Sequence, residues 1–216
     1  MNVAFMRLFL FGEIIIVVDK SQLINRNILH EYMLYKFPKL ESESLILREI
    51  KLSDAEAIYR IFSDSRVLKY HDLEEFKNIE EAKCLIYSLS EGFREQEVIR
   101  WGIAKKRENI IIGTCGYSGW NKNRLRAEIG YELSQAHWRQ GIMTKALSAV
   151  INYGFEVMQL NRIEATVMLP NIASMNLLHK LGFQEEGILR ERGFWKGHFH
   201  DLKMFALLKK DYVSTW

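Results

Sequence analysis

The feature that most constrains the fold is a strand–turn–helix passage in the second half of the chain. The sequence predicts a strand over residues 127–133, then a loop with an aromatic residue over 134–140. Gly141 opens a long helical pattern whose apolar face consists of Ala146, Leu147, Val150, Ile151, Phe155 and Met158. A helix N-terminus offers unpaired N–H donors, so such a turn in the middle of a sheet predicts a bound ligand there.

The elements around this passage predict an α/β fold. Before it, we expect a strand at 44–50, a helix opened by the capping-box spacing Ser53-x-x-Glu56, a helix at 80–93, and strands at 100–104 and 110–117. After it, we expect a strand at 162–168, a helix at 173–181 ended by Gly182, and a hairpin of 183–194 with 199–208. This order, β-α-α-β-β-β-α-β-α-β-β, is typical of a mixed sheet with helices on its faces.

Length and composition indicate one globular domain with an appendage. The 216 residues are 48% apolar and 26% charged, and the net charge of +3 does not by itself argue for nucleic acid. Cys84 and Cys115 lie far apart without CxxC spacing, which argues against a disulfide scaffold or a zinc site. We therefore expect a cytoplasmic protein without a metal site.

Residues 1–40 are predicted as an N-terminal appendage, and residues 41–216 as the folded domain. The apolar stretch over 3–18 is interrupted by Arg7 and Glu13, and a membrane helix needs about 20 apolar residues, so we expect no membrane segment. The β-branched run at 14–18 favours a strand. Residues 21–38 have a polar, helical pattern.

Four segments, in this order along the chain, resemble the GNAT superfamily of N-acetyltransferases. They are 128–133 (Glu-Ile-Gly-Tyr-Glu-Leu), 138–144 (Trp-Arg-Gln-Gly-Ile-Met-Thr), 171–183 (from Asn-Ile-Ala-Ser to Leu-Gly-Phe) and 206–212. Within the superfamily, the chain is similar to the ribosomal-protein N-terminal acetyltransferases and their relatives over residues 42–212. The resemblance implies a mostly antiparallel sheet of about seven strands, splayed between the fourth and fifth, with helices on both faces. It also implies acetyl-CoA as co-substrate.

The resemblance assigns residues to the cofactor. The segment 138–144 occupies the place of the acyl-CoA signature, whose backbone N–H groups bind the pyrophosphate at the helix N-terminus, so the implied contacts are Arg139, Gln140, Gly141, Ile142, Met143 and Thr144. Trp138 takes the first place of the signature. Met143 stands where the family has a small residue, so its side chain must point away from the pyrophosphate or narrow the turn. Tyr131 and Leu133 are implied to pair with the pantetheine through their main chain.

The resemblance also suggests which residues act in the reaction. Asn171 is implied to contact the pantetheine or the thioester, and Ser174 to lie near the sulfur, where it could protonate the departing thiolate. By local pattern alone, both are ordinary capping residues. Glu128, Glu164 and Glu191 are candidates for the base that takes the proton of the amine. We favour Glu128, although the sequence does not say which face of its strand meets the cleft.

The predicted function is transfer of the acetyl group of acetyl-CoA to a primary amine by direct attack in a ternary complex. The acceptor, a protein N-terminus or a small-molecule amine, stays open, and so does a homodimer. Met143 and the unassigned base motivate a second class, a non-catalytic acyl-CoA-binding or sensing module. The basic stretch at 122–126 motivates a third, a ribosome-associated RNA-binding protein. We expect no direct contact with nucleic acid.

Overall fold

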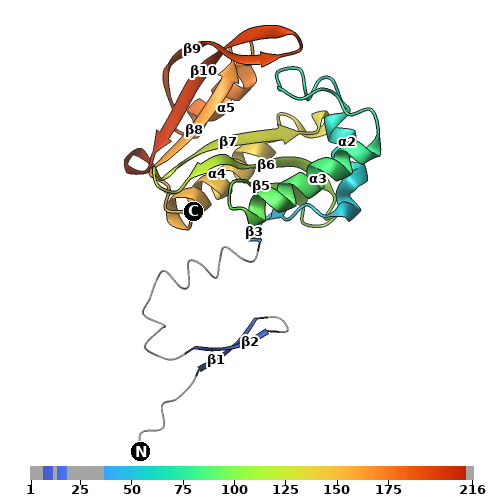
Figure 1. The fold of residues 1–216 in the computed structure, drawn as a ribbon, viewed down its shortest axis with the longest axis vertical. Helices are drawn as coiled ribbons and strands as arrows, with labels where there is room; N and C mark the ends of the chain where they lie inside the picture. The colour runs from blue at the N-terminus through green and yellow to red at the C-terminus, as the bar shows by residue number, and fades with distance from the viewer. Residues whose placement is uncertain (1–6, 12–13, 19–36, 213–216) are drawn as a thin grey trace, which may run out of the picture. The chain divides into compact units, whose positions relative to one another are not determined.

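The computed structural model describes residues 7–11, 14–18 and 37–212 (Figure 1). Backbone contacts divide the chain into two units, Met1–Pro38 and Lys39–Trp216. In the first unit, β1 (Arg7–Phe11) and β2 (Ile14–Val18) pair as antiparallel strands. The strand predicted at 14–18 is therefore present, whereas the helical pattern at 21–38 lies, up to residue 36, outside the described residues. The boundary at residue 40 between appendage and domain stays a prediction.

The second unit is built on one eight-stranded sheet in the order β3-β4-β5-β6-β7-β8-β10-β9. Its strands are β3 (Leu40–Glu41), β4 (Leu45–Arg48), β5 (Ile99–Lys105), β6 (Ile111–Asn121), β7 (Arg126–Leu133), β8 (Arg162–Met168), β9 (Gln184–Trp195) and β10 (His198–Leu208). All neighbours are antiparallel except β7 and β8. The predicted mixed, mostly antiparallel sheet is confirmed, and the two-residue β3 was not foreseen.

The sheet splits between β7 and β8. These parallel strands pair only over three residues each, from Arg126↔Arg162 to Glu128↔Glu164. Beyond that point β7 continues along β6 as far as Leu133, and β8 continues along β10 as far as Met168. Figure 1 shows β7 and β8 diverging from their common end. The predicted splay between the fourth and fifth of the longer strands is confirmed.

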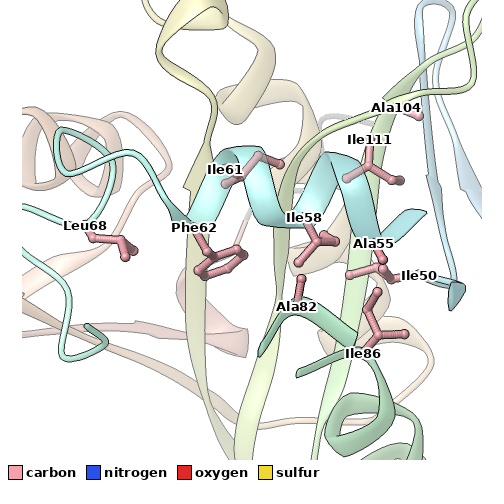
Figure 2. Close-up of a cluster of buried hydrophobic side chains, with 10 residues drawn as sticks. All are labelled: Ile50, Ala55, Ile58, Ile61, Phe62, Leu68, Ala82, Ile86, Ala104 and Ile111. Atoms are coloured by element: carbon pink, nitrogen blue, oxygen red, sulfur yellow. The ribbon is translucent and has the colours of Figure 1, made fainter. Parts of the chain in front are cut away.

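Two helices, α2 (Ala55–Phe62) and α3 (Ile79–Arg94), cover one face of the sheet. Figure 2 shows the cluster of side chains that joins them to the sheet, comprising Ile50, Ala55, Ile58, Ile61, Phe62, Leu68, Ala82, Ile86, Ala104 and Ile111. The α2 members recur at helical spacing, which is why one stripe of the helix is buried.

The predicted capping box at Ser53 is wrong. A short 3-10 helix (Leu52–Asp54) precedes α2, and no side chain caps α2 itself. Asp54 instead accepts two bonds from the Arg48 guanidinium, at 2.8 and 2.9 Å, and one from the Lys51 N–H at 2.8 Å. Asp54, which stands between the two residues of the predicted motif, therefore links the helix start to β4.

The opposite face of the sheet packs against α4 (Ile142–Glu156), the long helix predicted after Gly141. Tyr117 on β6 donates its hydroxyl to the Val150 carbonyl at 2.9 Å, and Trp101 on β5 meets Tyr153 edge to face. The last helix, α5 (Ile172–Lys180), follows β8. No helix within residues 37–212 is long and apolar enough to cross a membrane.

We expect Ile58→Ala to lower the free energy of unfolding by about 2–5 kcal/mol, because it leaves a cavity at a fully buried site between α2 and the sheet. The matched control is Leu52→Ala, at a residue that is 63% exposed, where the change should stay within about 0.5 kcal/mol. Urea unfolding followed by circular dichroism measures both. Equal effects of the two changes would contradict the packing described for α2.

Candidate active site

A cavity of about 370 Å³ lies where β7 and β8 separate. Both strands line it, with residues 128–132 on one side and 165–168 on the other. Asn171 and Ser174 from the start of α5 close one end, and Trp195 from the tip of the β9–β10 hairpin closes another. The remaining wall comes from residues 67–72 in the loop between α2 and α3. The split in the sheet therefore creates a site bounded by parts of the chain that are distant in sequence.

The edge of β7 that faces the split has free main-chain groups. Ser134 donates its N–H to the Ile112 carbonyl of β6 at 2.9 Å. Since main-chain groups point to alternate sides along a strand, Glu132 and Gly130 also bond toward β6, and Tyr131 and Leu133 face the split. The Leu133 carbonyl accepts a bond from Trp138 Nε1 at 2.7 Å. What remains for a ligand is the Tyr131 main chain and the Leu133 N–H.

The turn before α4 has the geometry of an anion cradle. Arg139 and Gly141 both take left-handed conformations, with φ of 58° and 71°. In the described part of the chain, no main-chain carbonyl accepts a bond from the N–H groups of residues 139–144. A Cβ built on Gly141 would meet no atom within 4 Å, so the space at the turn is open and the glycine is required by its φ.

The side chains around this turn leave the cradle clear. Ile142 and Met143 are each only 8% exposed and belong to the core, so Met143 does not narrow the turn. Arg139 and Lys145 are exposed and bring positive charge to the positive end of the α4 dipole. Gln140 bonds back to the Ala136 carbonyl at 3.0 Å. Open N–H groups, a helix N-terminus and nearby cations fit the pyrophosphate of an acyl-CoA.

Asn171 and Ser174 lie at the start of α5, on the cavity. Asn171 is the N-cap, and its Oδ1 accepts the Ser174 N–H at 3.2 Å. The Ser174 hydroxyl does not cap the helix but lies 2.7 Å from the Tyr131 hydroxyl. Burial raises the pKa of Tyr131 to about 12, so its proton stays in place at neutral pH. The predicted pair is thus joined to a tyrosine hydroxyl that the sequence did not suggest.

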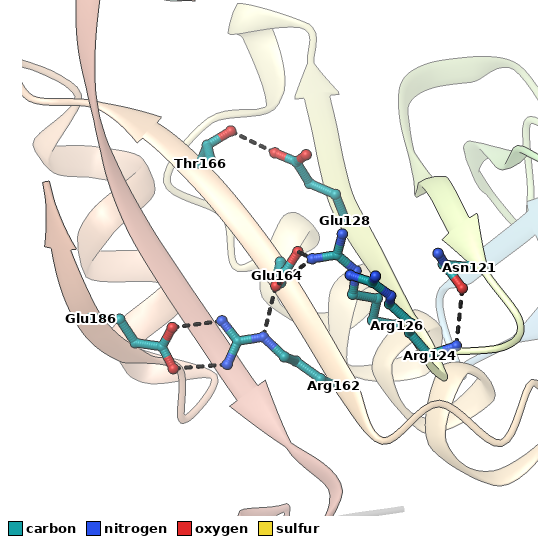
Figure 3. A network of polar contacts seen from close by, with 8 residues as sticks. All are labelled: Asn121, Arg124, Arg126, Glu128, Arg162, Glu164, Thr166 and Glu186. Carbon is teal, nitrogen blue, oxygen red and sulfur yellow. Dashed lines mark hydrogen bonds and ion pairs between the residues drawn. The ribbon is translucent and has the colours of Figure 1, made fainter. Parts of the chain in front are cut away.

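Of the three predicted acids, Glu128 alone lines the cavity. It is half-buried, and the Thr166 hydroxyl on β8 donates to its Oε1 at 2.5 Å (Figure 3). No cation in the described part of the chain lies within ion-pair distance of its carboxylate. Glu128 is therefore an unpaired negative charge at the point where the strands separate.

The other two acids have different surroundings. Glu164 forms ion pairs with Arg126 at 3.2 Å and with Arg162 at 2.7 Å, and Arg162 also binds Glu186 (Figure 3). This network lies where β7 and β8 still pair, before the split. Glu191 is exposed at a φ of 52°, and its N–H donates to Asp201 on β10. Neither carboxylate lines the cavity.

A buried acid that the sequence analysis missed lies at the floor of the cavity. The Glu132 side chain is only 4% exposed and accepts bonds from Arg100, Thr114 and His71. Burial alone would raise its pKa, but the charge of Arg100 and the bond from His71 lower it to about 2. Glu132 lies on the same face of β7 as Glu128, four residues further along the strand. Nothing in the local sequence indicates its partner His71, which lies 61 residues away in a segment without regular structure.

The fold and this turn agree with what comparison with known families shows. Residues 44–184 match the model of the acetyltransferase (GNAT) domain. The chain belongs to the GNAT acetyltransferase family.

Similar proteins extend this assignment. The uncharacterized N-acetyltransferase YoaA of Bacillus subtilis is 41% identical to this GNAT protein over 173 residues, which cover 80% of this chain and 98% of the other. The [ribosomal protein uS5]-alanine N-acetyltransferase of Escherichia coli is 25% identical over 81% of this chain and 93% of its own. The crystal structure of ribosomal-protein-S5-alanine acetyltransferase from Vibrio fischeri is 26% identical, with a TM-score of 0.72 over 82% of this chain and 99% of that one. This GNAT protein is thus an acetyl-CoA-dependent N-acetyltransferase.

We expect Gly141→Ala to weaken acetyl-CoA binding by about tenfold. Gly141 has a left-handed conformation, in which an alanine costs about 1–2 kcal/mol. The turn can relieve this strain only by changing its backbone conformation, which moves the N–H groups proposed to bind the cofactor. Isothermal titration calorimetry measures the dissociation constant. Gly119→Ala is the matched control, since Gly119 also has a positive φ, 57°, with no atom within 4 Å of the added Cβ, but lies on β6 away from the turn. An equal loss of affinity in both variants would argue against the cradle.

Proposed function

We propose that this GNAT protein acetylates a primary amine by direct attack in a ternary complex, with Glu128 as the base. The observation that carries the proposal is the position of Glu128, an unpaired carboxylate on the cavity at the split between β7 and β8. When bound, acetyl-CoA supplies the acetyl group as a thioester, whose transfer to the amine forms an amide and releases the CoA thiol. The cofactor would be held by the main chain of Tyr131, by the N–H groups of residues 139–144, and by Asn171.

The base is needed because an amine attacks only when neutral, and most amines are protonated at pH 7. Glu128 is placed to accept this proton, directly or through water. The hydroxyl of Thr166 occupies one of its oxygens, and the other faces no cation in the described residues. A carboxylate without an ion-pair partner also favours the approach of a cationic ammonium group. Glu128 thus both attracts the acceptor and removes its proton.

The departing thiolate needs a proton in return, and Ser174 is placed to give it. Its hydroxyl shares a bond of 2.7 Å with the Tyr131 hydroxyl, and a bond donated by Tyr131 leaves the Ser174 proton free to be donated. A thiolate is a good leaving group, so this assistance contributes less than the base. Neither cysteine lines the cavity, and Cys115 is fully buried, with a pKa raised to about 12 by that burial. These features support direct transfer over a covalent enzyme intermediate.

For the acceptor, we propose a protein N-terminal amine, with a small-molecule amine as the alternative. The support is the similarity to the two ribosomal-protein alanine acetyltransferases, each over more than 80% of this chain. The cavity itself supports an amine of either kind, since Glu128 and Asp72 supply carboxylates and Tyr70 and Trp195 supply aromatic faces. A panel of N-terminal peptides, polyamines and aminoglycosides distinguishes the two.

We expect Glu128→Gln to lower kcat by about 10² or more at pH 7, the usual contribution of a general base. The defect should shrink as the pH approaches the pKa of the acceptor amine, because a neutral amine no longer needs the base. Release of the CoA thiol, followed with a thiol reagent across the acceptor panel, measures the rate. Glu191→Gln is the control, at an exposed carboxylate outside the cavity, and should keep the wild-type rate.

Ser174→Ala should lower kcat by roughly tenfold or less in the same thiol-release assay, since it removes general-acid assistance to a good leaving group.

An unchanged rate in Glu128→Gln would remove Glu128 from the mechanism. Tight acetyl-CoA binding without thiol release on any acceptor would contradict transfer to the amines tested and favour the sensing module.

A further inference from the structure

A chain of alternating charges runs from the floor of the cavity to its rim. It begins with Arg100 on β5, passes through Glu132 on β7 to His71, and ends at Asp72. His71 Nε2 lies 2.7 Å from Glu132 Oε1, and His71 Nδ1 lies 2.9 Å from Asp72 Oδ1. The exposed fraction of the side chain rises from 4% for Glu132 through 28% for His71 to 68% for Asp72. His71 therefore joins a buried carboxylate to an exposed one.

The buried end of this chain is rigidly held. Glu132 Oε2 accepts bonds from the Arg100 guanidinium and from the Thr114 hydroxyl, and Arg100 Nε also donates to that hydroxyl at 3.1 Å. The guanidinium lies over Gly130, where a Cβ would come within 3.1 Å of Nη1. A buried carboxylate is costly unless its lone pairs are satisfied, and here all the partners are fixed to strands. Glu132 Oε1 is thus a fixed point to which His71 binds.

The segment that carries His71 forms one wall of the cavity. Residues 67–72 line it with the side chains of Val67, Tyr70, His71 and Asp72. A second contact holds this segment, since Lys196 at the tip of the β9–β10 hairpin donates to the Leu68 carbonyl at 3.2 Å. Among the described residues, residues 67–72 are joined to the floor of the cavity by the side-chain hydrogen bond between His71 and Glu132.

We propose that His71 is a positioning residue for the acceptor amine, whose protonated ring bridges Glu132 and Asp72 and so fixes residues 67–72 as the acceptor-side wall. This role rests on the proposed transfer reaction. His71 does not touch the reacting atoms but sets where Tyr70 and Asp72 stand when the acceptor enters. Losing the bridge therefore raises the KM for the acceptor and leaves the affinity for acetyl-CoA unchanged, because the turn at 139–144 contains no member of the bridge.

The charge of His71 makes this role dependent on pH. Burial alone would lower the pKa of the ring, but the bonds to Asp72 and Glu132 raise it from 6.5 to about 9. The cations nearby are Arg100, which acts through Glu132, and Lys196, which binds the same segment. The stabilisation from the charged ring is complete below pH 6.5 and is lost as the pH rises through about 9.

Loss of the proton also changes the partners of the ring. A neutral imidazole has one donor and one acceptor nitrogen, so it cannot donate to both carboxylates. If Nε2 keeps its hydrogen and its bond to Glu132, Nδ1 becomes an acceptor for the Leu73 N–H, 3.3 Å away. Asp72 is then released from the bridge.

The experiment compares wild type with His71→Gln, whose side chain can bind Glu132 but carries no charge. We expect the ratio of their kcat/KM values for the acceptor to be about tenfold at pH 7. The difference should lie in KM rather than in kcat, because a hydrogen bond from a charged donor is stronger than one from a neutral donor. The ratio should fall toward one above pH 9, where the wild-type ring is also neutral. Taking a ratio cancels the titration of the acceptor itself. Calorimetry should give the same acetyl-CoA affinity for both proteins.

His198→Gln is the matched control, at an exposed histidine on the hairpin, and should change neither constant. NMR titration of the His71 ring gives a readout without turnover, with a midpoint near pH 9 in wild type. A kcat/KM ratio of one at pH 7, a ratio constant with pH, or a ring midpoint near 6.5 would each overturn the proposal. Wild type that releases no thiol with any amine would overturn the transfer reaction and this role with it, a result distinct from normal turnover with a ratio of one.

Discussion

The end of pairing between β7 and β8 is the constraint on which the rest of the active site depends. Three residues of each strand hold the two halves of the sheet together, and past Glu128 no described strand pairs with this edge of β7. Unpaired main-chain groups inside a protein are costly, so this edge requires either water or a ligand that can bond as a strand does. Asn171 and Ser174 at the start of α5 line the same opening, and the N–H groups of residues 139–144 at the start of α4 have no main-chain carbonyl partner among the described residues.

Most of the fold could be predicted because its signals are local. The order of strands and helices follows from periodicity, and the helix after Gly141 and the hairpin at the C-terminal end are where the sequence indicates. Most boundaries differ by a residue or two, as at α5, which begins at Ile172 rather than Ala173, whereas β6 runs to Asn121, four residues beyond its predicted end. The capping box at Ser53 failed because a short 3-10 helix at Leu52–Asp54 precedes α2, and Asp54 rather than Ser53 stands at the N-cap of α2, where its carboxylate binds Arg48. The splay itself came from the resemblance, since no periodicity signals where two strands stop pairing.

The candidate site likewise has a part that could be predicted from sequence and a part that could not. Gly141, Asn171 and Ser174 belong to turns that a few neighbouring residues determine, and the resemblance to the family identifies these three residues. Which acid faces the cavity was undecidable from sequence, because it depends on which face of each strand meets the split. Which acid lacks an ion pair depends on the cations nearby, and Glu164 lies between two arginines that approach from β7 and from its own strand. The bond between His71 and Glu132 could not be predicted from the sequence either. It joins an irregular loop to a strand across 61 residues, and only the folded chain brings them together.

In the proposed reaction, the walls for the two substrates come from different stretches of chain. The proposed cofactor side consists of residues 131–144 and the start of α5, whereas the proposed acceptor side consists largely of residues 67–72 and Trp195. The first stretch is constrained by main-chain geometry, such as the left-handed Gly141, and the second by side chains carried on a loop and a hairpin tip. Substitutions in the loop and hairpin can accumulate without disturbing the turn that we propose binds the pyrophosphate of the cofactor. Such a division allows one scaffold to diversify its choice of amine during evolution while the donor stays the same.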